Sequence, residues 1–151
     1  MDEQIETPGH LYSVDCNQRW IDNTKAKISS ELEDFVTFTV SSASVCEHFG
    51  TLCHRYDQLP NVSPNFIYVD GPANRDVTGE IAGVGFTEGR SVVGADVLLY
   101  ESTAPLDFFI LVDGRWETCR FLKRSLQGRY RHRRYVARKY ETFEYISEEF
   151  Y

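Results

Sequence analysis

Phe66-Ile67-Tyr68-Val69-Asp70-Gly71 is the stretch that decides the expected fold, because it returns 43 residues later as Phe109-Ile110-Leu111-Val112-Asp113-Gly114. Each copy consists of four apolar residues, an aspartate and a glycine. A short apolar run bounded by glycine is typical of a strand that is buried on both faces. We therefore expect buried strands at 66–70 and 108–113. Asp70 and Asp113 then lie at the carboxyl ends, where open α/β sheets bind ligands.

Strand and helix patterns alternate along the rest of the chain. Further strands are expected at 10–15 and 34–40, and a closing antiparallel hairpin over 129–146 is expected to turn near 139–141. Helices are expected over 17–33, 44–56, 94–102 and 115–127, with a long loop over 71–92. This alternation predicts a single α/β domain over 1–151, with a mostly parallel, three-layer, Rossmann-like sheet that ends in the antiparallel hairpin.

The expected helix over 44–56 depends on two local patterns. Val45, Phe49, Leu52 and Tyr56 form an apolar stripe at helical spacing. Ser44 and Glu47 match a capping box, in which each side chain bonds the backbone of the other residue.

Length and composition restrict the class of protein. The 151 residues suit one domain, and the apolar runs are too short to span a bilayer. The first residues are acidic and lack the apolar segment of a signal peptide, so a cytoplasmic location is expected. Cys16, Cys46, Cys53 and Cys119 form no CxxC pair, so we expect free or buried thiols and no metal site.

The net charge of −7 is unevenly distributed. Residues 115–139 hold 10 of the 16 Lys and Arg residues, with Glu117 as their only acid. Such a segment indicates either a surface for phosphate or nucleic acid, or a solvated helix face next to polar strand positions. The acidic remainder of the chain would repel DNA, which argues against a nucleic-acid partner.

The order and spacing of these segments resemble class I S-adenosylmethionine-dependent methyltransferases, from their second strand to their end. Tyr12-Ser13-Val14-Asp15 is similar to the second strand, and the resemblance implies that Asp15 holds the ribose hydroxyls of S-adenosylmethionine. Ser41 and Ser42 occupy the place of the turn that contacts the adenine. The two aspartate-glycine strands resemble the fourth and fifth strands, and this implies catalytic roles for Asp70 and Asp113 in methylating a small molecule.

The chain departs from this family at its start. Only residues 1–10 precede Leu11, so the family's first strand and glycine-rich loop are missing. The resemblance therefore implies an N-terminally truncated, incomplete domain. Cofactor affinity is expected to be poor and activity is expected to be lost if that unit is truly absent.

Two alternatives remain open from the sequence. Asp70, Glu101 and Asp113 could form the carboxylate cluster of a metal-dependent nuclease. The chain could instead be a noncatalytic fragment that forms a homo-oligomer or needs a partner chain to complete its sheet, because unpaired strand edges favour association.

Overall fold

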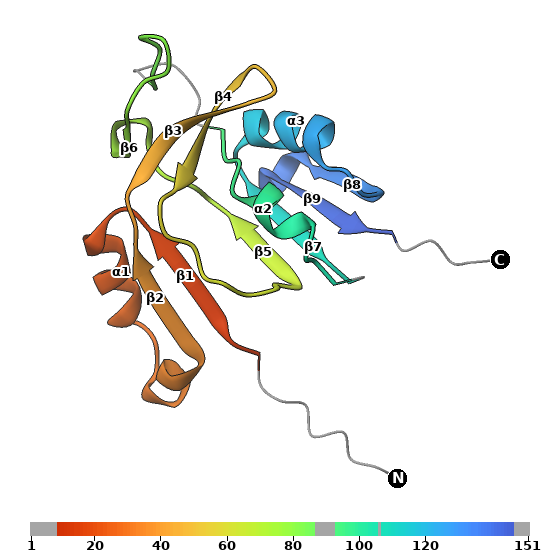
Figure 1. The fold of residues 1–151 in the computed structure, drawn as a ribbon. Helices are drawn as coiled ribbons and strands as arrows, with labels where there is room; N and C mark the ends of the chain where they lie inside the picture. Colours follow the sequence, from red (N-terminus) through yellow and green to blue (C-terminus); the bar gives the residue numbers. More distant parts are fainter. Residues whose placement is uncertain (1–8, 87–92, 106, 147–151) are drawn as a thin grey trace, which may run out of the picture.

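The computed structural model describes residues 9–86, 93–105 and 107–146. Its helices are α1 (Gln18–Lys25), α2 (Val97–Glu101) and α3 (Trp116–Ser125), and its 3₁₀ helices are Ser30–Phe35, Asn74–Asp76 and Val136–Arg138. The strands form three sheets of two, three and four strands, as Figure 1 shows. Among the described residues, no helix has both the length and the apolar character needed to cross a membrane.

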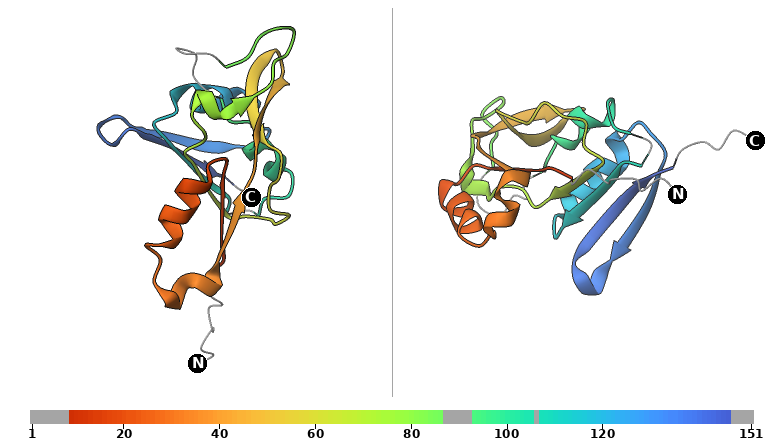
Figure 2. Two further views of the ribbon diagram at one scale, coloured as in Figure 1. Left: turned by 90° about the vertical axis from the view of Figure 1, so that its left-hand side faces the viewer. Right: turned by 90° about the horizontal axis from the view of Figure 1, so that it is seen from below.

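The largest sheet holds both copies of the repeated stretch. Its order is β5 (Phe66–Val69), β7 (Phe109–Asp113), β9 (Tyr140–Tyr145) and β8 (Tyr130–Tyr135). The β5 and β7 strands pair in parallel, with Phe66 opposite Phe109 and Val69 opposite Val112. The β7–β9 and β8–β9 pairs are antiparallel, which confirms the closing hairpin. Figure 2 shows this hairpin projecting beyond the rest of the ribbon.

The main core forms where β7 meets α3. Ile110 and Val112 on β7 are fully buried, as are Phe108 before it and Leu122 on α3. Cys119 and Leu122, three residues apart, place one face of α3 against this sheet. Helix α3 begins and ends within two residues of the expected 115–127 helix, because its apolar spacing is local and regular.

A second, smaller unit is built from the N-terminal part of the chain. Strand β1 (Leu11–Asp15) pairs in parallel with β2 (Val36–Val40), and α1 lies beside them in Figure 1. The Asn17 side chain accepts a hydrogen bond from the backbone of Arg19 and caps α1. The expected helix over 17–33 is therefore shorter than predicted, and a 3₁₀ helix over Ser30–Phe35 follows it.

The three-stranded sheet replaces the expected helix over 44–56, and that prediction is wrong. Strands β3 (Ala43–His48) and β4 (Thr51–Tyr56) form an antiparallel hairpin, and β6 (Val77–Thr78) pairs with β3. Phe49 and Gly50 make the two-residue turn with φ of 48° and 73°. The Glu47 carboxylate accepts a hydrogen bond from the Gly50 backbone, so it holds the turn rather than a helix cap.

The prediction of a mostly parallel, three-layer, Rossmann-like sheet is therefore also wrong. The strands divide into separate sheets, and the two larger sheets combine parallel and antiparallel pairs. The longest ladders, β3–β4 and β8–β9, are antiparallel with six residue pairs each. The physical reason is the hairpin. Without a crossover helix over 44–56, the chain cannot continue the strand-helix alternation that a parallel sheet needs.

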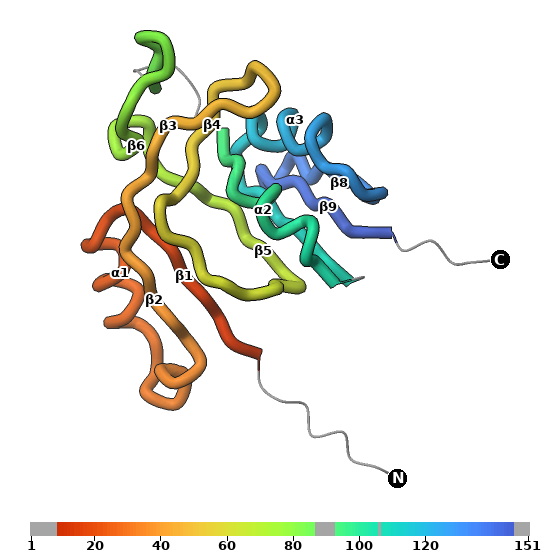
Figure 3. Tube along the Cα trace, viewed as in Figure 1, coloured from red at the N-terminus to blue at the C-terminus, as the bar shows by residue number. Residues whose placement is uncertain are grey.

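In the segment between β5 and β7, the described residues 71–86 are mostly irregular, as expected. Figure 3 traces the described parts, from β5 to β6 and from residue 93 into α2. Residues 87–92 lie outside the described residues. The short helix α2 confirms the helix predicted within 94–102.

Candidate functional site

The candidate site lies at the carboxyl ends of β1, β5 and β7, where polar and ionisable side chains meet the end of β4. We call these residues the strand-end cluster: Asp15, Cys16, His54, Tyr56, Asp70, Gly71, Asp96 and Arg115. Parallel pairing places Asp15 and Asp70 at the carboxyl ends of their strands, as predicted from the sequence.

Arg115 joins the ends of β5 and β7. Its guanidinium donates to the backbone carbonyls of Gly71 and Pro72 at 2.7 and 2.9 Å, and lies 3.8 Å from an Asp70 carboxylate oxygen. Gly71 has a φ of +74°, a conformation that glycine adopts without strain. Arg115 therefore clamps the loop after β5, while the Asp70 side chain remains 71% exposed and accessible to a ligand.

His54 is the most deeply buried ionisable group of the cluster, with 2% exposure. Its backbone exchanges hydrogen bonds with Val93 and Ala95, which makes β4 adjacent to the segment before α2. A Cβ on Gly94 would come within 3.3 Å of the His54 ring, so the glycine permits this close approach. Burial first, and then the charge of Arg115, lowers the pKa of His54 to about 4, so the imidazole is neutral at pH 7.

Asp96 lies beside this imidazole. Its Oδ2 is 3.8 Å from His54 Nε2, and its Oδ1 accepts a hydrogen bond from the Tyr56 backbone at 2.9 Å. Burial raises the pKa of Asp96 to about 6. Because His54 is neutral, this contact is not a pair of full charges. A carboxyl group that titrates near neutral pH can accept or release a proton during a reaction.

Tyr56 lies between the His54–Asp96 contact and the end of β1. Its ring lies 6.0 Å from the His54 ring in an edge-to-face arrangement. Burial raises the pKa of Tyr56, and the nearby Cys16, Asp15 and Asp96 raise it further. Cys16, which follows β1, and Asp96, which precedes α2, thus lie near the same side chain.

The sequence-predicted site residues have different environments. One Asp15 oxygen accepts a hydrogen bond from the Asn17 backbone at 2.7 Å, and the side chain is partly exposed. Asp113 accepts a hydrogen bond from the Tyr68 hydroxyl at 2.8 Å. Tyr68 has its pKa raised to about 12, first by desolvation and then by this bond.

Ser41 and Ser42 join the end of β2 to the chain after β4. The Ser41 hydroxyl donates to the Ser42 carbonyl at 3.1 Å and accepts from the Gln58 backbone at 2.8 Å. The Ser42 carbonyl also accepts from the Asp57 backbone. Ser41 is 3% exposed, so its hydroxyl supports the fold locally.

Sequence reasoning missed His54, Tyr56 and Asp96 as members of one cluster. The expected helix over 44–56 places His54 and Tyr56 on different faces, because residues two apart on a helix point in different directions, whereas alternate residues of a strand share a face. A strand assignment for Thr51–Tyr56 would have placed both rings on one face.

No family model, curated protein or solved structure matches this chain significantly.

Proposed function

We propose that this chain is a methyltransferase-like protein that binds S-adenosylmethionine and a small-molecule acceptor at the strand-end cluster. The observation that supports this proposal is the parallel pairing of β1–β2 and β5–β7, which puts Asp15 and Asp70 at strand carboxyl ends. His54, Tyr56 and Asp96 contact one another between these ends of the sheet strands. Asp15 and Cys16 lie near Tyr56, and Arg115 lies near His54.

Asp15 is the residue that would hold the ribose of the cofactor. A carboxylate at this place accepts hydrogen bonds from both hydroxyls of a vicinal diol. The Asp15 carboxylate has further acceptor capacity beyond its bond to the Asn17 backbone. Ser41 fits the proposed adenine turn less well, because both hydrogen bonds of its hydroxyl are made within the fold.

Asp70 would orient the acceptor molecule. Its carboxylate is exposed and lies beside Arg115, so it can accept a hydrogen bond from an acceptor hydroxyl while the guanidinium fixes the loop. When bound, S-adenosylmethionine supplies the methyl group, and the contribution of the chain is mainly to position the reactants. Asp113, which accepts a hydrogen bond from the Tyr68 hydroxyl, would stabilise the carboxyl end of β7 rather than contact the acceptor.

The nuclease alternative is less well supported. No group of three His, Cys, Asp or Glu side chains among the described residues could hold a metal ion. Glu101 accepts hydrogen bonds from the backbones of Gln127 and Gly128, next to the start of β8. Asp113 lies at the opposite end of β7, next to Tyr140.

We also propose a cytoplasmic location and a small-molecule substrate rather than a nucleic acid. All four cysteines are free, as is usual in a reducing compartment. The net charge of −7 disfavours a polyanionic partner.

Calorimetric titration of S-adenosylmethionine into the full chain tests this function. We expect Asp15→Asn to weaken binding at least about tenfold, since a hydrogen bond to a charged group contributes roughly 1.5–3 kcal/mol. Asparagine retains an oxygen that can accept from the Asn17 backbone, so the capped turn should persist.

Asp22→Asn is the matched control, because Asp22 is an exposed carboxylate on α1 whose side chain accepts a hydrogen bond from Gln18. This variant should bind the cofactor like the wild type. Equal affinity of the wild type and Asp15→Asn, or no binding by the wild type at millimolar concentrations, would contradict the proposal.

A further inference from the structure

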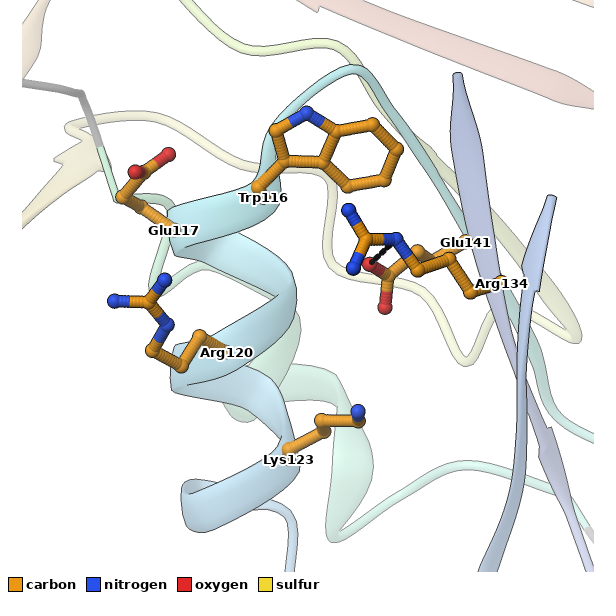
Figure 4. Close-up of a pocket in the computed structure, with 6 residues that line it drawn as sticks. All are labelled: Trp116, Glu117, Arg120, Lys123, Arg134 and Glu141. Atoms are coloured by element: carbon orange, nitrogen blue, oxygen red, sulfur yellow. Dashed lines mark ion pairs between the residues drawn. The ribbon is translucent and has the colours of Figure 1, made fainter. Parts of the chain in front are cut away.

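A pocket separate from the strand-end cluster lies between α3 and the β8–β9 hairpin. It has a volume of about 300 Å³ and shares no residue with the cluster. Figure 4 shows the side chains that line it: Trp116, Glu117, Arg120, Lys123, Arg134 and Glu141. We call it the α3–β8 pocket.

The buried carboxylate of this pocket is already neutralised within the fold. Glu141 is 5% exposed, and its Oε1 lies 3.5 Å from Arg134 Nε. Its other oxygen contacts His132 Nε2. A carboxylate buried to this extent requires such partners. Glu141 therefore positions Arg134 and adds little negative charge for an incoming ligand to meet.

Arg134 is held from a second direction. Its guanidinium carbon lies 4.4 Å from the centre of the Trp116 ring, and Figure 4 shows the guanidinium between this ring and the Glu141 carboxylate. Stacking on an aromatic ring and pairing with a carboxylate fix the plane of the guanidinium. Its remaining N–H groups are thus arranged before any ligand arrives.

Two further cations line the pocket, and among the described residues they form no ion pair. They are Arg120 and Lys123, which are exposed on α3. The surrounding segment is also strongly basic, because residues 115–139 contain ten Lys and Arg residues and a single acid, Glu117, which lines the pocket. The local field therefore favours an anion, although the whole chain is acidic.

We propose that the α3–β8 pocket binds a phosphate-bearing small molecule, with Lys123 and Arg134 as donors to the phosphate and Arg120 adding positive charge. A phosphate monoester offers three acceptor oxygens and a charge near −2, which suits donors that come from two different elements. The volume is at the lower end of the range for small-molecule pockets. A long polyanion would be repelled by the acidic remainder of the chain.

Tryptophan fluorescence tests this site, because the chain has only two tryptophans. Trp20 is 58% exposed on α1, so Trp20→Phe should fold normally and leave Trp116 as the reporter in the pocket. Inorganic phosphate, titrated at constant ionic strength with potassium chloride, should change the Trp116 emission in a saturable way.

Substitutions in the Trp20→Phe background distinguish specific binding in the pocket from nonspecific electrostatic attraction. Lys123→Gln should weaken phosphate binding at least about fivefold. Arg134→Lys keeps the positive charge beside Glu141 but replaces the planar guanidinium with an ammonium group, so it should also weaken phosphate binding. Arg124→Gln, an exposed neighbour on α3 that does not line the pocket, should have no effect.

Three results would overturn the proposal. The first is a response to phosphate that does not saturate. The second is a loss of affinity in Arg124→Gln equal to that in Lys123→Gln. The third is tighter binding of a ten-nucleotide single-stranded RNA than of phosphate at physiological salt, which would identify a nucleic-acid surface.

Discussion

The buried His54 and the half-buried Asp96 make the stability of the protein depend on pH in opposite directions. The folded chain holds the pKa of His54 at about 4, below its ordinary value of 6.5. The unfolded chain therefore binds more protons at His54 between these values, and stability is lost as the pH falls. Asp96 has its pKa raised from 3.8 to about 6, so its contribution to stability is lost as the pH rises through 6.

We expect Asp96→Asn to separate these effects, because asparagine cannot ionise but retains the oxygen that accepts from Tyr56. The free energy of unfolding of this variant minus that of the wild type should rise by about 2–3 kcal/mol from pH 4 to pH 7. Urea unfolding at several pH values measures this difference. His54→Gln should show the opposite trend, and a flat difference for both variants would contradict the assignment.

At the scale of the element, the β3–β4 hairpin brings two cysteines together. Cys46 is directly opposite Cys53 in the ladder. Opposed residues of antiparallel strands have Cα atoms about 4.5–5.5 Å apart, within the range of a disulfide. In a helix, the same seven-residue spacing would separate them by about 10 Å along the axis.

We therefore expect a mild oxidant to form an intramolecular Cys46–Cys53 disulfide. Cys46 should react first, because the neighbouring Cys53 side chain lowers its pKa, whereas the pKa of Cys53 is raised. Peptide mapping by mass spectrometry identifies the bond. Cys16 is the comparison thiol, since burial raises its pKa, and a disulfide between Cys16 and either hairpin cysteine would contradict the described arrangement.

At the scale of the whole molecule, division into three sheets leaves strand edges without partners. Among the described strands, β1 pairs only with β2 and β5 pairs only with β7. Leu11 on β1 and Tyr68 on β5 are 57% and 53% exposed. Figure 1 shows β1 and β5 running in the same direction. Unpaired, apolar strand edges favour pairing with another chain.

We expect the chain to associate with a second copy of itself as its concentration increases. The combined substitution Leu11→Lys and Tyr68→Lys should shift it toward the monomer, because charges on an edge oppose strand pairing. Size-exclusion chromatography with light scattering measures the mass. Leu99→Lys is the control, since Leu99 is similarly exposed but lies on α2. A wild-type chain that stays monomeric at high concentration would exclude this association.

Local patterns predicted much of the secondary structure. The repeated apolar stretches form β5 and β7, and the two strands pair in parallel. The prediction that both are buried is wrong for β5, because β5 is an edge strand and its Phe66 and Tyr68 side chains are exposed. Helix α3 and the β8–β9 hairpin also form where expected. Each depends on neighbouring residues in the sequence, so periodicity was sufficient. The 44–56 segment is the exception, because its apolar residues fall three and four apart by coincidence on either side of a hairpin turn at Phe49 and Gly50.

The sequence by itself determined the apolar strands and the aspartates that end them, because a strand and its terminal residue are set by local burial and turn chemistry. Only the tertiary structure decided that the strands form three sheets and that His54, Asp96 and Arg115 meet at one edge. Strand pairing joins residues far apart in the chain, and its outcome depends on which hydrogen-bonding edges become available. A sequence pattern shows which face of each strand is apolar, but it does not show which other strand pairs with each edge.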